Sequence, residues 1–169
     1  MFEVYNKQVE LLLNCLPIVA KTTEFALKGG TAINMFIRDQ YPRLSVDIDL
    51  CYLPVLSRDE TLIGIEFSLL EIEKNIRTAF NYKVKQSRNI ASKTVAKLVV
   101  DNGATQIKIE PNLILRGAVY PIVKQNLSKK VENIYGIAVY DMPLLAKEEI
   151  YAGKICAALD RQHPRDLFD

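Results

Sequence analysis

The amino-acid sequence predicts an α+β fold, in which helices pack on a mixed β-sheet. The predicted order is helix, strand, glycine turn, helix, acidic strand, long helix, hairpin and helix, which differs from the alternation of a doubly wound parallel sheet. The chain has 169 residues, of which 49% are hydrophobic and 25% are charged. This length and composition suit one globular domain with a substantial core. We therefore expect residues 1–169 to form a single domain.

The elements before residue 54 follow from the spacing of apolar residues. This spacing predicts a helix over residues 3–14, and Pro17 predicts a second helical stretch that opens there. Residues 25–27 are a short apolar run, as in a strand that ends at a glycine pair. An apolar stripe predicts a helix over residues 31–39, and residues 46–53 predict the strand that carries two aspartates.

The second half of the chain begins with a long helix. Ser57 and Glu60 have the spacing of a capping box, which predicts a helix that runs to about residue 80. Apolar strand-type runs then occur at residues 82–87, 94–101 and 105–115. Asn102-Gly103 lies between the last two runs and predicts a hairpin with a type I′ turn, which needs positive φ at both central positions.

Two further elements are expected towards the C-terminus. A short strand is expected over residues 119–123, and residues 142–160 predict a final helix with Pro143 in its first turn. We expect the apolar residues Ile150, Ile155 and Leu159 of this helix to pack on the sheet.

Charge and cysteine content restrict the class of protein. A formal net charge of +2 is too small to indicate nucleic-acid binding, so any such surface requires local clustering of Lys and Arg. Cys15, Cys51 and Cys156 are far apart and indicate reduced cysteines of a cytoplasmic protein. No run approaches the ~20 apolar residues that span a membrane. His163 is the only histidine, so we expect no zinc site.

Asp47 and Asp49 are the strongest functional signal. Residues i and i+2 of a strand point to the same face, so both carboxylates project together while Ile48 faces the other way. Two like charges this close repel, and a divalent metal is the usual remedy. The alternative is a solvated strand edge, against which the strongly strand-forming apolar neighbours argue. The pattern predicts a site for Mg²⁺ or Mn²⁺.

Gly29 and Gly30 lie just upstream of the acidic strand. Glycines let the backbone approach a ligand closely, and the free N–H groups of a following helix attract phosphate. The surrounding residues form neither a Walker A loop nor a G-x-G-x-x-G motif. A plain strand-to-helix turn is the alternative for the glycine pair alone. Together with the aspartates, the pair predicts a site for a metal-bound nucleoside triphosphate.

Two separated motifs resemble the AbiEii/AbiGii toxin family of nucleotidyltransferases, which belongs to the DNA polymerase β-like superfamily. The first covers residues 27–53, with Gly-Gly-Thr-Ala followed by Arg-Leu-Ser-Val-Asp-Ile-Asp-Leu. The second is the run at residues 154–161 followed by Arg-Asp-Leu-Phe-Asp at 165–169. The resemblance implies the minimal polymerase β-like nucleotidyltransferase fold.

The resemblance also implies roles for the matching residues. The residues implied to bind the nucleotide are Gly29, Gly30, Thr31, Arg43, Ser45 and Lys154. Those implied to bind metal are Asp47, Asp49 and a third carboxylate, Glu110. Those implied to take part in catalysis are Asp47, Asp49, Glu110, Lys154 and Asp166. Lys154 would neutralise triphosphate charge, and Asp166 would be its partner or would orient it.

The third carboxylate has a rival. Glu110 faces opposite to Ile107 and Ile109 on its strand, whereas Asp101 ends a strand beside the predicted turn and is better explained as a turn residue. We favour Glu110. The alternative for Glu110 is a solvent-facing glutamate paired with Lys108.

The function implied is Mg²⁺-dependent transfer of NMP from an NTP to an acceptor hydroxyl, of an RNA such as tRNA or of a protein. The setting implied is a toxin–antitoxin or phage-defence system with a cognate antitoxin. Two alternatives stay open: a catalytically impaired nucleotide-binding or partner-binding module, and a small-molecule transferase of the antibiotic-adenylating type. Family members usually continue into a helical C-terminal domain. Because this sequence stops at Asp169, we expect that domain to be absent and transfer by this chain alone to be slow or undetectable.

Overall fold

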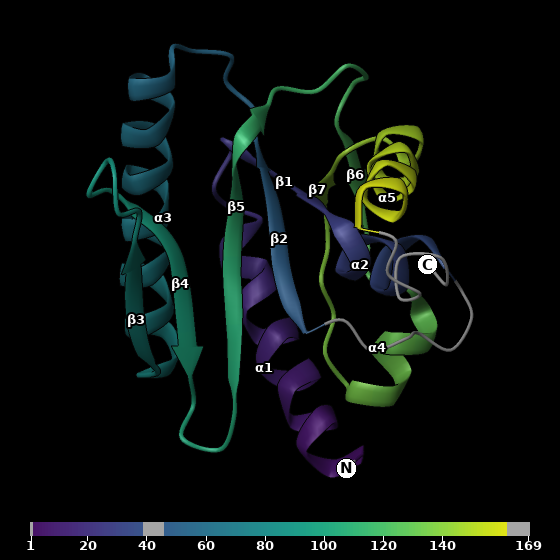
Figure 1. Cartoon of the computed structure of the whole chain (residues 1–169). Coiled ribbons are helices and arrows are strands. Elements are labelled where there is room, and N and C mark those ends of the chain that lie inside the picture. Colours follow the sequence, from purple (N-terminus) through teal and green to yellow (C-terminus); the bar gives the residue numbers. More distant parts are fainter. Residues whose placement is uncertain (1, 39–45, 162–169) are drawn as a thin grey trace.

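The computed structural model describes residues 2–38 and 46–161 of the chain. Within these residues, seven strands form one sheet in the order β3-β4-β5-β2-β1-β7-β6 (Figure 1). The strands are β1 (Phe25–Lys28), β2 (Asp47–Tyr52), β3 (Lys83–Arg88), β4 (Val95–Asp101), β5 (Gln106–Arg116), β6 (Val123–Gln125) and β7 (Met142–Leu144). β1 pairs in parallel with β7 and β2 with β5, whereas the other neighbours are antiparallel. The predicted mixed sheet is confirmed.

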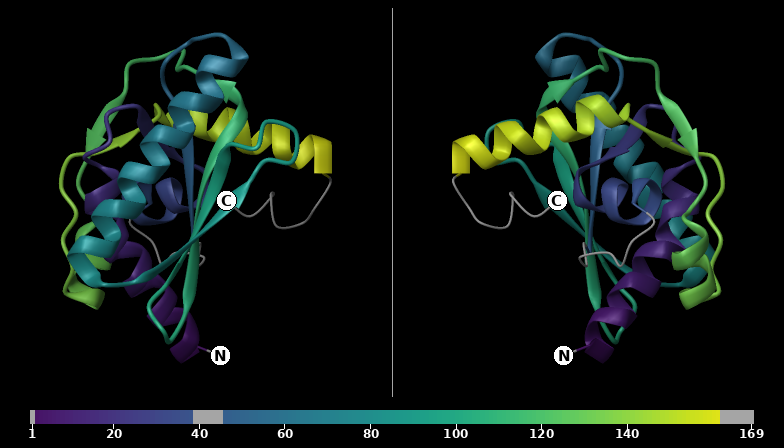
Figure 2. Two further views of the ribbon diagram at one scale, coloured as in Figure 1. Left: turned by 90° about the vertical axis from the view of Figure 1, so that its left-hand side faces the viewer. Right: turned by 90° about the vertical axis from the view of Figure 1, so that its right-hand side faces the viewer.

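Helices lie on both sides of this sheet. They are α1 (Phe2–Val19), α2 (Gly29–Ala32), α3 (Arg58–Phe80), α4 (Lys129–Tyr135) and α5 (Lys147–Arg161), with a π-helical turn η1 (Ile33–Ile37) after α2. α1 and α3 cover one face of the sheet, and α5 projects from the opposite side (Figure 2). None of the described helices covers the other face of β3, β4 and β5 (Figure 1). None of the helices in the described part of the chain is long and apolar enough to cross a lipid bilayer.

The N-terminal helix is longer than the sequence predicts. α1 continues through Pro17 to Val19, so the expected break at Pro17 is wrong. A proline removes only one helical hydrogen bond, and this one lies in the last turn of the helix. The residues around it are buried, and their packing holds the helical conformation. The buried residues of this half of α1 include Leu12, Leu13, Cys15, Leu16 and Val19.

The long helix begins and ends as predicted. The hydroxyl of Ser57 accepts a hydrogen bond from the backbone N–H of Glu60, and the Glu60 carboxylate accepts one from the backbone N–H of Ser57. This is the capping box expected at the start of α3. The helix ends at Phe80, followed by Asn81 in the left-handed conformation.

The β4–β5 hairpin is confirmed, but its turn is not type I′. Asp101 pairs with Gln106, so four residues form the loop, and of Asn102 and Gly103 only Gly103 has positive φ. The side chain of Asn102 accepts hydrogen bonds from the backbone N–H groups of Ala104 and Thr105. These bonds stabilise a longer loop in which Asn102 keeps an ordinary φ.

The segment between β5 and α5 differs most from prediction. The expected strand over residues 119–123 is wrong, because the backbone N–H groups of Val119 and Tyr120 donate to the carboxylate of Glu149 in the first turn of α5. The strand β6 begins only at residue 123, and α4 follows without having been predicted. Pro143, expected in a helix, lies in β7. Pairing with β1 is made at Leu144, so the missing N–H of Pro143 disturbs no bond to that strand.

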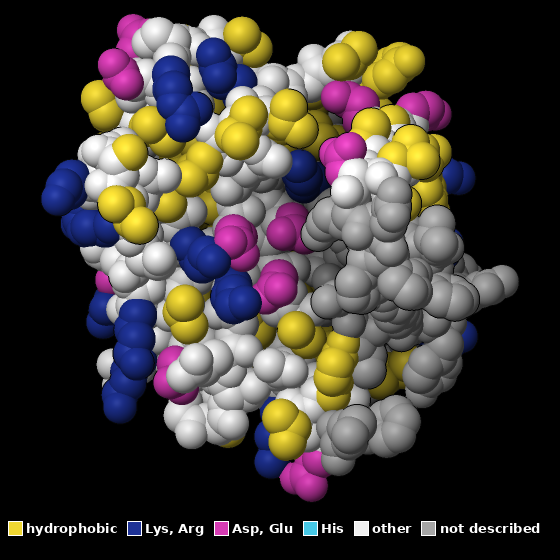
Figure 3. Space-filling view, viewed as in Figure 1, with side chains coloured by type: hydrophobic (Ala, Val, Ile, Leu, Met, Phe, Trp, Pro, Cys, Tyr) yellow, Lys and Arg dark blue, Asp and Glu magenta, His cyan; other side chains and the backbone are white. Residues whose placement is uncertain are grey.

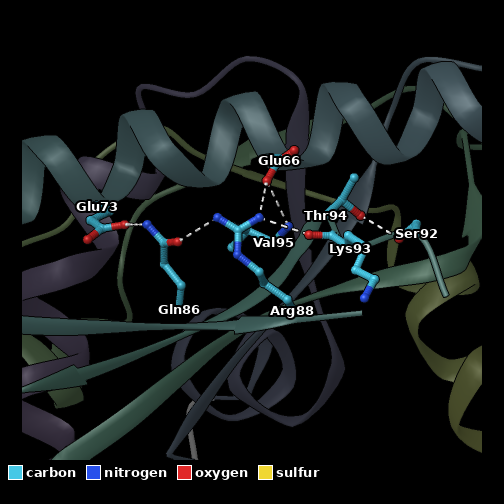
Figure 4. A network of polar contacts seen from close by, with 8 residues as sticks. All are labelled: Glu66, Glu73, Gln86, Arg88, Ser92, Lys93, Thr94 and Val95. Carbon is cyan, nitrogen blue, oxygen red and sulfur yellow. Dashed lines mark hydrogen bonds and ion pairs between the residues drawn. The ribbon is translucent and has the colours of Figure 1, made fainter. Parts of the chain in front are cut away.

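A network of polar contacts anchors the β3–β4 hairpin to α3 (Figure 4). The Glu66 carboxylate accepts from the Arg88 guanidinium at 3.1 Å and from the backbone N–H of Val95 at 3.0 Å. Gln86 donates to Glu73 of α3 at 2.7 Å. The register shift between residues 87 and 88 accompanies the approach of Arg88 to α3. The edge of the sheet is thereby held against the helix.

Candidate active site

β2 places Asp47 and Asp49 on the sheet face that α1 and α3 leave uncovered. Both are half-buried, while Ile48 between them is fully buried in the core. In the parallel pairing with β5, Asp47 lies beside Lys108 and Asp49 lies beside Glu110. Figure 3 shows acidic side chains together in the middle of this face, over β2 and β5, with basic side chains next to them. The predicted common face of the two aspartates is confirmed.

Gly29 lies directly against Asp49. The residue has φ +71°, in the left-handed region that favours glycine, and a Cβ built on it would run into the Asp49 carboxylate. Lys28 precedes this turn and lies opposite Asp49 in the antiparallel pairing of β1 with β2. The strand-to-turn junction thus brings a basic side chain and a bare backbone to the same carboxylate.

Thr31 ties the start of α2 to β2. Its side chain is fully buried, and its hydroxyl donates a 2.6 Å hydrogen bond to the backbone carbonyl of Asp47. This bond fixes the glycine turn relative to the strand that carries both aspartates. Gly30 lies inside α2, beside the turn.

Burial and the charged residues of this face shift the pKa of Asp49. Burial raises the pKa of Asp49 from 3.8 to about 6, and the neighbouring carboxylates of Asp47 and Glu110 raise it as well. Lys28 and Lys154 lower it. The raised pKa means that folding disfavours the ionised form of Asp49, chiefly because burial takes the carboxylate out of water. A cation bound at Asp49 would stabilise the ionised carboxylate.

Glu110 is engaged by a lysine from a neighbouring strand. The Lys97 ammonium of β4 lies 2.6 Å from the Glu110 carboxylate, so the partner is Lys97 and not the Lys108 considered from sequence. In the described part of the chain, no three His, Cys, Asp or Glu side chains are close enough together to hold a metal ion. The face therefore contains two adjacent aspartates, with the third carboxylate of the predicted set bound to a lysine.

Asp101, the rival third carboxylate, is a turn residue. It accepts hydrogen bonds from the backbone N–H of Gly103 at 2.7 Å and from the side chain of Gln106 at 2.9 Å. These bonds lower the pKa of Asp101. Its position at the end of β4, bound to the hairpin, agrees with the preference for Glu110.

α5 brings Lys154 near the aspartates but does not pack as expected. Lys154 is half-buried, and its charge lowers the pKa of Asp49. Ile150 is buried, whereas Ile155 and Leu159 are 62% and 72% exposed. The prediction that all three pack on the sheet is wrong, because α5 points away from the sheet beyond its first turns (Figure 2).

A comparison with protein-family models shows the family of the chain. The model described as "Nucleotidyl transferase AbiEii toxin, Type IV TA system" matches residues 10–169. The chain belongs to this AbiEii family. Its family is therefore one of nucleotidyltransferase toxins of type IV toxin–antitoxin systems, as the two sequence motifs indicated.

The fold of this AbiEii chain is similar to a solved structure of a nucleotidyltransferase toxin. MenT4 from Mycobacterium tuberculosis matches with a TM-score of 0.61 and 18% sequence identity. The match covers 90% of this chain and 53% of that chain, so the AbiEii chain spans about half of the length of MenT4. At this identity the similarity concerns the fold, and it confirms the predicted fold class. No curated protein matches the chain.

Some predicted site residues of the AbiEii chain lie outside the described residues. These are Arg43, Ser45 and Asp166. Sequence reasoning missed two residues that the structure brings to the face, Lys28 and Lys97. The signal for Lys28 was its position directly before the glycine pair. Lys97 had no local signal, because only the pairing of β4 with β5 brings it beside Glu110.

Proposed function

We propose that this chain transfers a nucleoside monophosphate from a nucleoside triphosphate to an acceptor hydroxyl, with Mg²⁺ or Mn²⁺ held by Asp47 and Asp49. The observation that carries the proposal is the pair of carboxylates on one strand face beside the glycine turn, with the pKa of Asp49 raised to about 6 by burial and by Asp47. Carboxylate oxygens are the ligands that Mg²⁺ prefers, so the residues present fit such an ion. A divalent ion there would neutralise charge on the phosphates.

The glycine turn is the proposed triphosphate site. Gly29 and Gly30 carry no side chain, so phosphate oxygens can approach their backbone N–H groups. Lys28 and Lys154 would add positive charge at this position, as their effect on the pKa of Asp49 supports. The Thr31 hydroxyl is used by the Asp47 carbonyl, so we assign Thr31 to positioning the turn and its backbone to phosphate.

Arg43, Ser45 and Asp166 enter this proposal through the family resemblance alone. Arg43 and Ser45 would lie close to the nucleotide, and Asp166 would orient or pair with Lys154. Substitution of each to alanine, with nucleotide affinity measured, tests these assignments.

The proposed reaction is an in-line displacement. The acceptor oxygen forms a bond to the α-phosphorus, and the bond from that phosphorus to the bridging oxygen breaks, so that pyrophosphate leaves with the electron pair. The hydroxyl proton passes to a carboxylate, for which Glu110 is the candidate because it lies beside Asp49. Asp47 and Asp49 would hold the divalent ion, whose charge would stabilise the negative charge on the phosphoryl group undergoing transfer.

The acceptor we propose is RNA, such as tRNA, and the setting is that of a cytoplasmic toxin with a cognate antitoxin. Membership of a type IV toxin–antitoxin family supports the setting. The three cysteines are free, and Cys156 is also exposed, which is consistent with a reducing compartment. Growth arrest on expression of the chain, relieved by the cognate antitoxin and absent for Asp47→Asn, would test the setting.

The deciding experiment measures transfer directly. Each of the four NTPs, labelled at the α-phosphate, is incubated with the chain, Mg²⁺ and total RNA or cell extract. We expect label in RNA for the wild type, even if transfer is slow, and none for Asp49→Asn. Label in protein would replace RNA as acceptor, and label in a small molecule would favour a transferase of the antibiotic-adenylating type. Equal label with Asp49→Asn would refute the proposed site.

A catalytically impaired nucleotide-binding module is the second candidate. The observation that favours it is the Lys97–Glu110 ion pair at 2.6 Å, which engages the proposed base. This candidate predicts that Mg-NTP binds with a normal dependence on Asp47 and Asp49 while no pyrophosphate is released. Measurement of pyrophosphate in the same reactions separates the two functions.

A further inference from the structure

The uncovered face of β3, β4 and β5 contains a row of lysines that leads to the aspartates. Lys85 of β3 lies beside Val99 of β4, Val99 lies beside Lys108 of β5, and Lys108 lies beside Asp47 of β2. The next row on the same face lies two residues further along the strands and contains Ser87, Lys97, Glu110 and Asp49. We call Lys85, Lys97 and Lys108 the lysine row.

The opposite face of the same strands shows why these side chains point outward. Val84, Leu98, Val100 and Ile109 alternate with the lysines and are buried in the core against α1 and α3. Strand alternation therefore sends the lysines to the face without a helix. Basic side chains are visible beside the acidic group on this face (Figure 3).

Two lysines of the row are not held in an ion pair within the described part of the chain, although the charge of Lys85 helps to lower the pKa of Asp101. Lys85 and Lys108 are exposed and form no ion pair there, whereas Lys97 is bound to Glu110. An exposed lysine at the edge of a sheet also discourages pairing with other chains, but Lys108 lies on β5 inside the sheet. Two exposed charges that form no ion pair, in line with the aspartates, thus favour binding of an anion along the row.

The length of the row decides which anion fits. From Lys85 to Asp47 there are three strand spacings, which is about 14 Å. A triphosphate at the glycine turn lies on the far side of Asp47 and Asp49 and does not also extend along this row. A chain of phosphodiesters carries a negative charge at each nucleotide, and so it matches lysines that are spaced along a line.

We propose that the lysine row binds the phosphodiester backbone of the acceptor RNA and leads its reactive end to Asp47 and Asp49. This inference rests on the proposed nucleotidyl transfer to RNA. The two rows of the sheet contain lysine, valine, serine and acidic residues but, among the described residues, no aromatic side chain to stack on a base. The row therefore contacts phosphates and does not read sequence.

The test compares two double variants of equal net charge. Lys85→Ala/Lys108→Ala removes the unpaired lysines of the row, and Lys21→Ala/Lys74→Ala removes two exposed lysines outside it. Affinity for a fluorescently labelled single-stranded RNA is measured by anisotropy at a series of KCl concentrations. Each lost phosphate contact lowers the slope of log affinity against log salt by roughly 0.7, so the row variant should lose about 1.4 and the control variant nothing.

Equal salt slopes for the two double variants would overturn the proposal that the lysine row binds RNA. A DNA strand of the same sequence should show the same loss of slope, because the backbone charge is shared. A wild-type slope of the row variant with both strands would count against the row. Glutamine in place of alanine at both positions removes the charge while keeping most of the side chain, and it should give the same result if an alanine variant folds poorly.

The outcome is separable from that of the proposed function. Suppose that the wild type transfers label to RNA, and that the row variant binds RNA with wild-type affinity and has the same KM for RNA. The lysine row is then wrong, and the proposed function stands. If the salt slope falls as expected but no NTP yields labelled RNA, the row stands and the transfer is wrong. Mg-NTP affinity should be the same in both double variants.

Discussion

Gly29 leaves the space that the Asp49 carboxylate occupies. A Cβ on Gly29 would run into that carboxylate, and the φ of +71° is one that other residues rarely adopt. The glycine that sequence reasoning assigned to phosphate binding therefore also has a structural task, because it lets a strand residue and the following turn pack side by side.

Gly29→Ala should destabilise the fold and weaken nucleotide binding. The left-handed φ costs a residue with a Cβ about 1–2 kcal/mol, and displacement of Asp49 adds to this. Gly136→Ala is the matched control, since Gly136 has φ +66° with open space around its Cβ position. Urea unfolding should show a greater loss for Gly29→Ala. Equal losses of unfolding free energy in the two variants would mean that the close approach of Gly29 to Asp49 does not affect stability.

Gly30 offers a cleaner test of the phosphate site, because it lies within α2. Gly30→Val should abolish nucleotide binding by blocking the approach to the backbone, while the variant stays folded by circular dichroism. Unchanged affinity for Mg-NTP in calorimetry would show that the turn is only structural.

The stability of the metal-free protein should fall as pH rises from about 4 to about 6. The pKa of Asp49 is 3.8 when unfolded and about 6 when folded, so the folded state binds more protons in this window. Asp49→Asn removes the penalty and should be more stable than the wild type at pH 7.5, by as much as roughly 3 kcal/mol. The gain should vanish near pH 4. A pH-independent difference would contradict the raised pKa.

Mg²⁺ should compete with protons for the aspartates. Metal binding needs ionised carboxylates, so the rise in Tm on adding MgCl₂ should be largest at pH 7.5 and shrink as the pH falls below about 6. Asp47→Asn and Asp49→Asn should each lose most of the rise and most of the Mg-NTP affinity. A wild-type response in either variant would remove that residue from the metal site.

Glu110 should matter for transfer more than for binding. General-base help is worth roughly 10²–10⁴-fold in rate, so Glu110→Gln should lose transfer while it still binds Mg-NTP. Asp101→Asn is the control, because Asp101 is bound to the hairpin. If Asp101→Asn loses transfer and Glu110→Gln does not, the assignment of the two carboxylates is reversed.

Lys154→Ala should weaken triphosphate binding, because a lysine contact to phosphate is a charge-assisted one. Lys147→Ala is the control on the same helix, where the Lys147 ammonium lies 5.9 Å from the centre of the Tyr151 ring. Calorimetry with Mg-NTP should show a loss for Lys154→Ala alone. An equal affinity in both variants would place Lys154 outside the nucleotide site.

Features that depend on nearby residues were predictable from the sequence. The capping box of α3 joins residues three apart, the common face of Asp47 and Asp49 follows from strand alternation, and the β4–β5 hairpin joins adjacent segments. The family resemblance likewise rests on short motifs, those at residues 27–53, 154–161 and 165–169. In each of these cases the deciding contacts are made within a few residues, so local patterns contain the information.

Tertiary structure decided what depends on distant segments. Sequence alone offered Lys108 as the partner of Glu110, two residues along one strand, but Lys97 of the next strand lies closer because strands are only ~4.8 Å apart. Pro143 lies in a strand because β7 pairs with β1 and β6, although proline is also suited to the first turn of a helix. The pKa of Asp49 is raised chiefly by burial, and charges on three other elements modify it, with Glu110 of β5 raising it and Lys28 of β1 and Lys154 of α5 lowering it. Register and burial are properties of the packed chain, and a local pattern does not specify them.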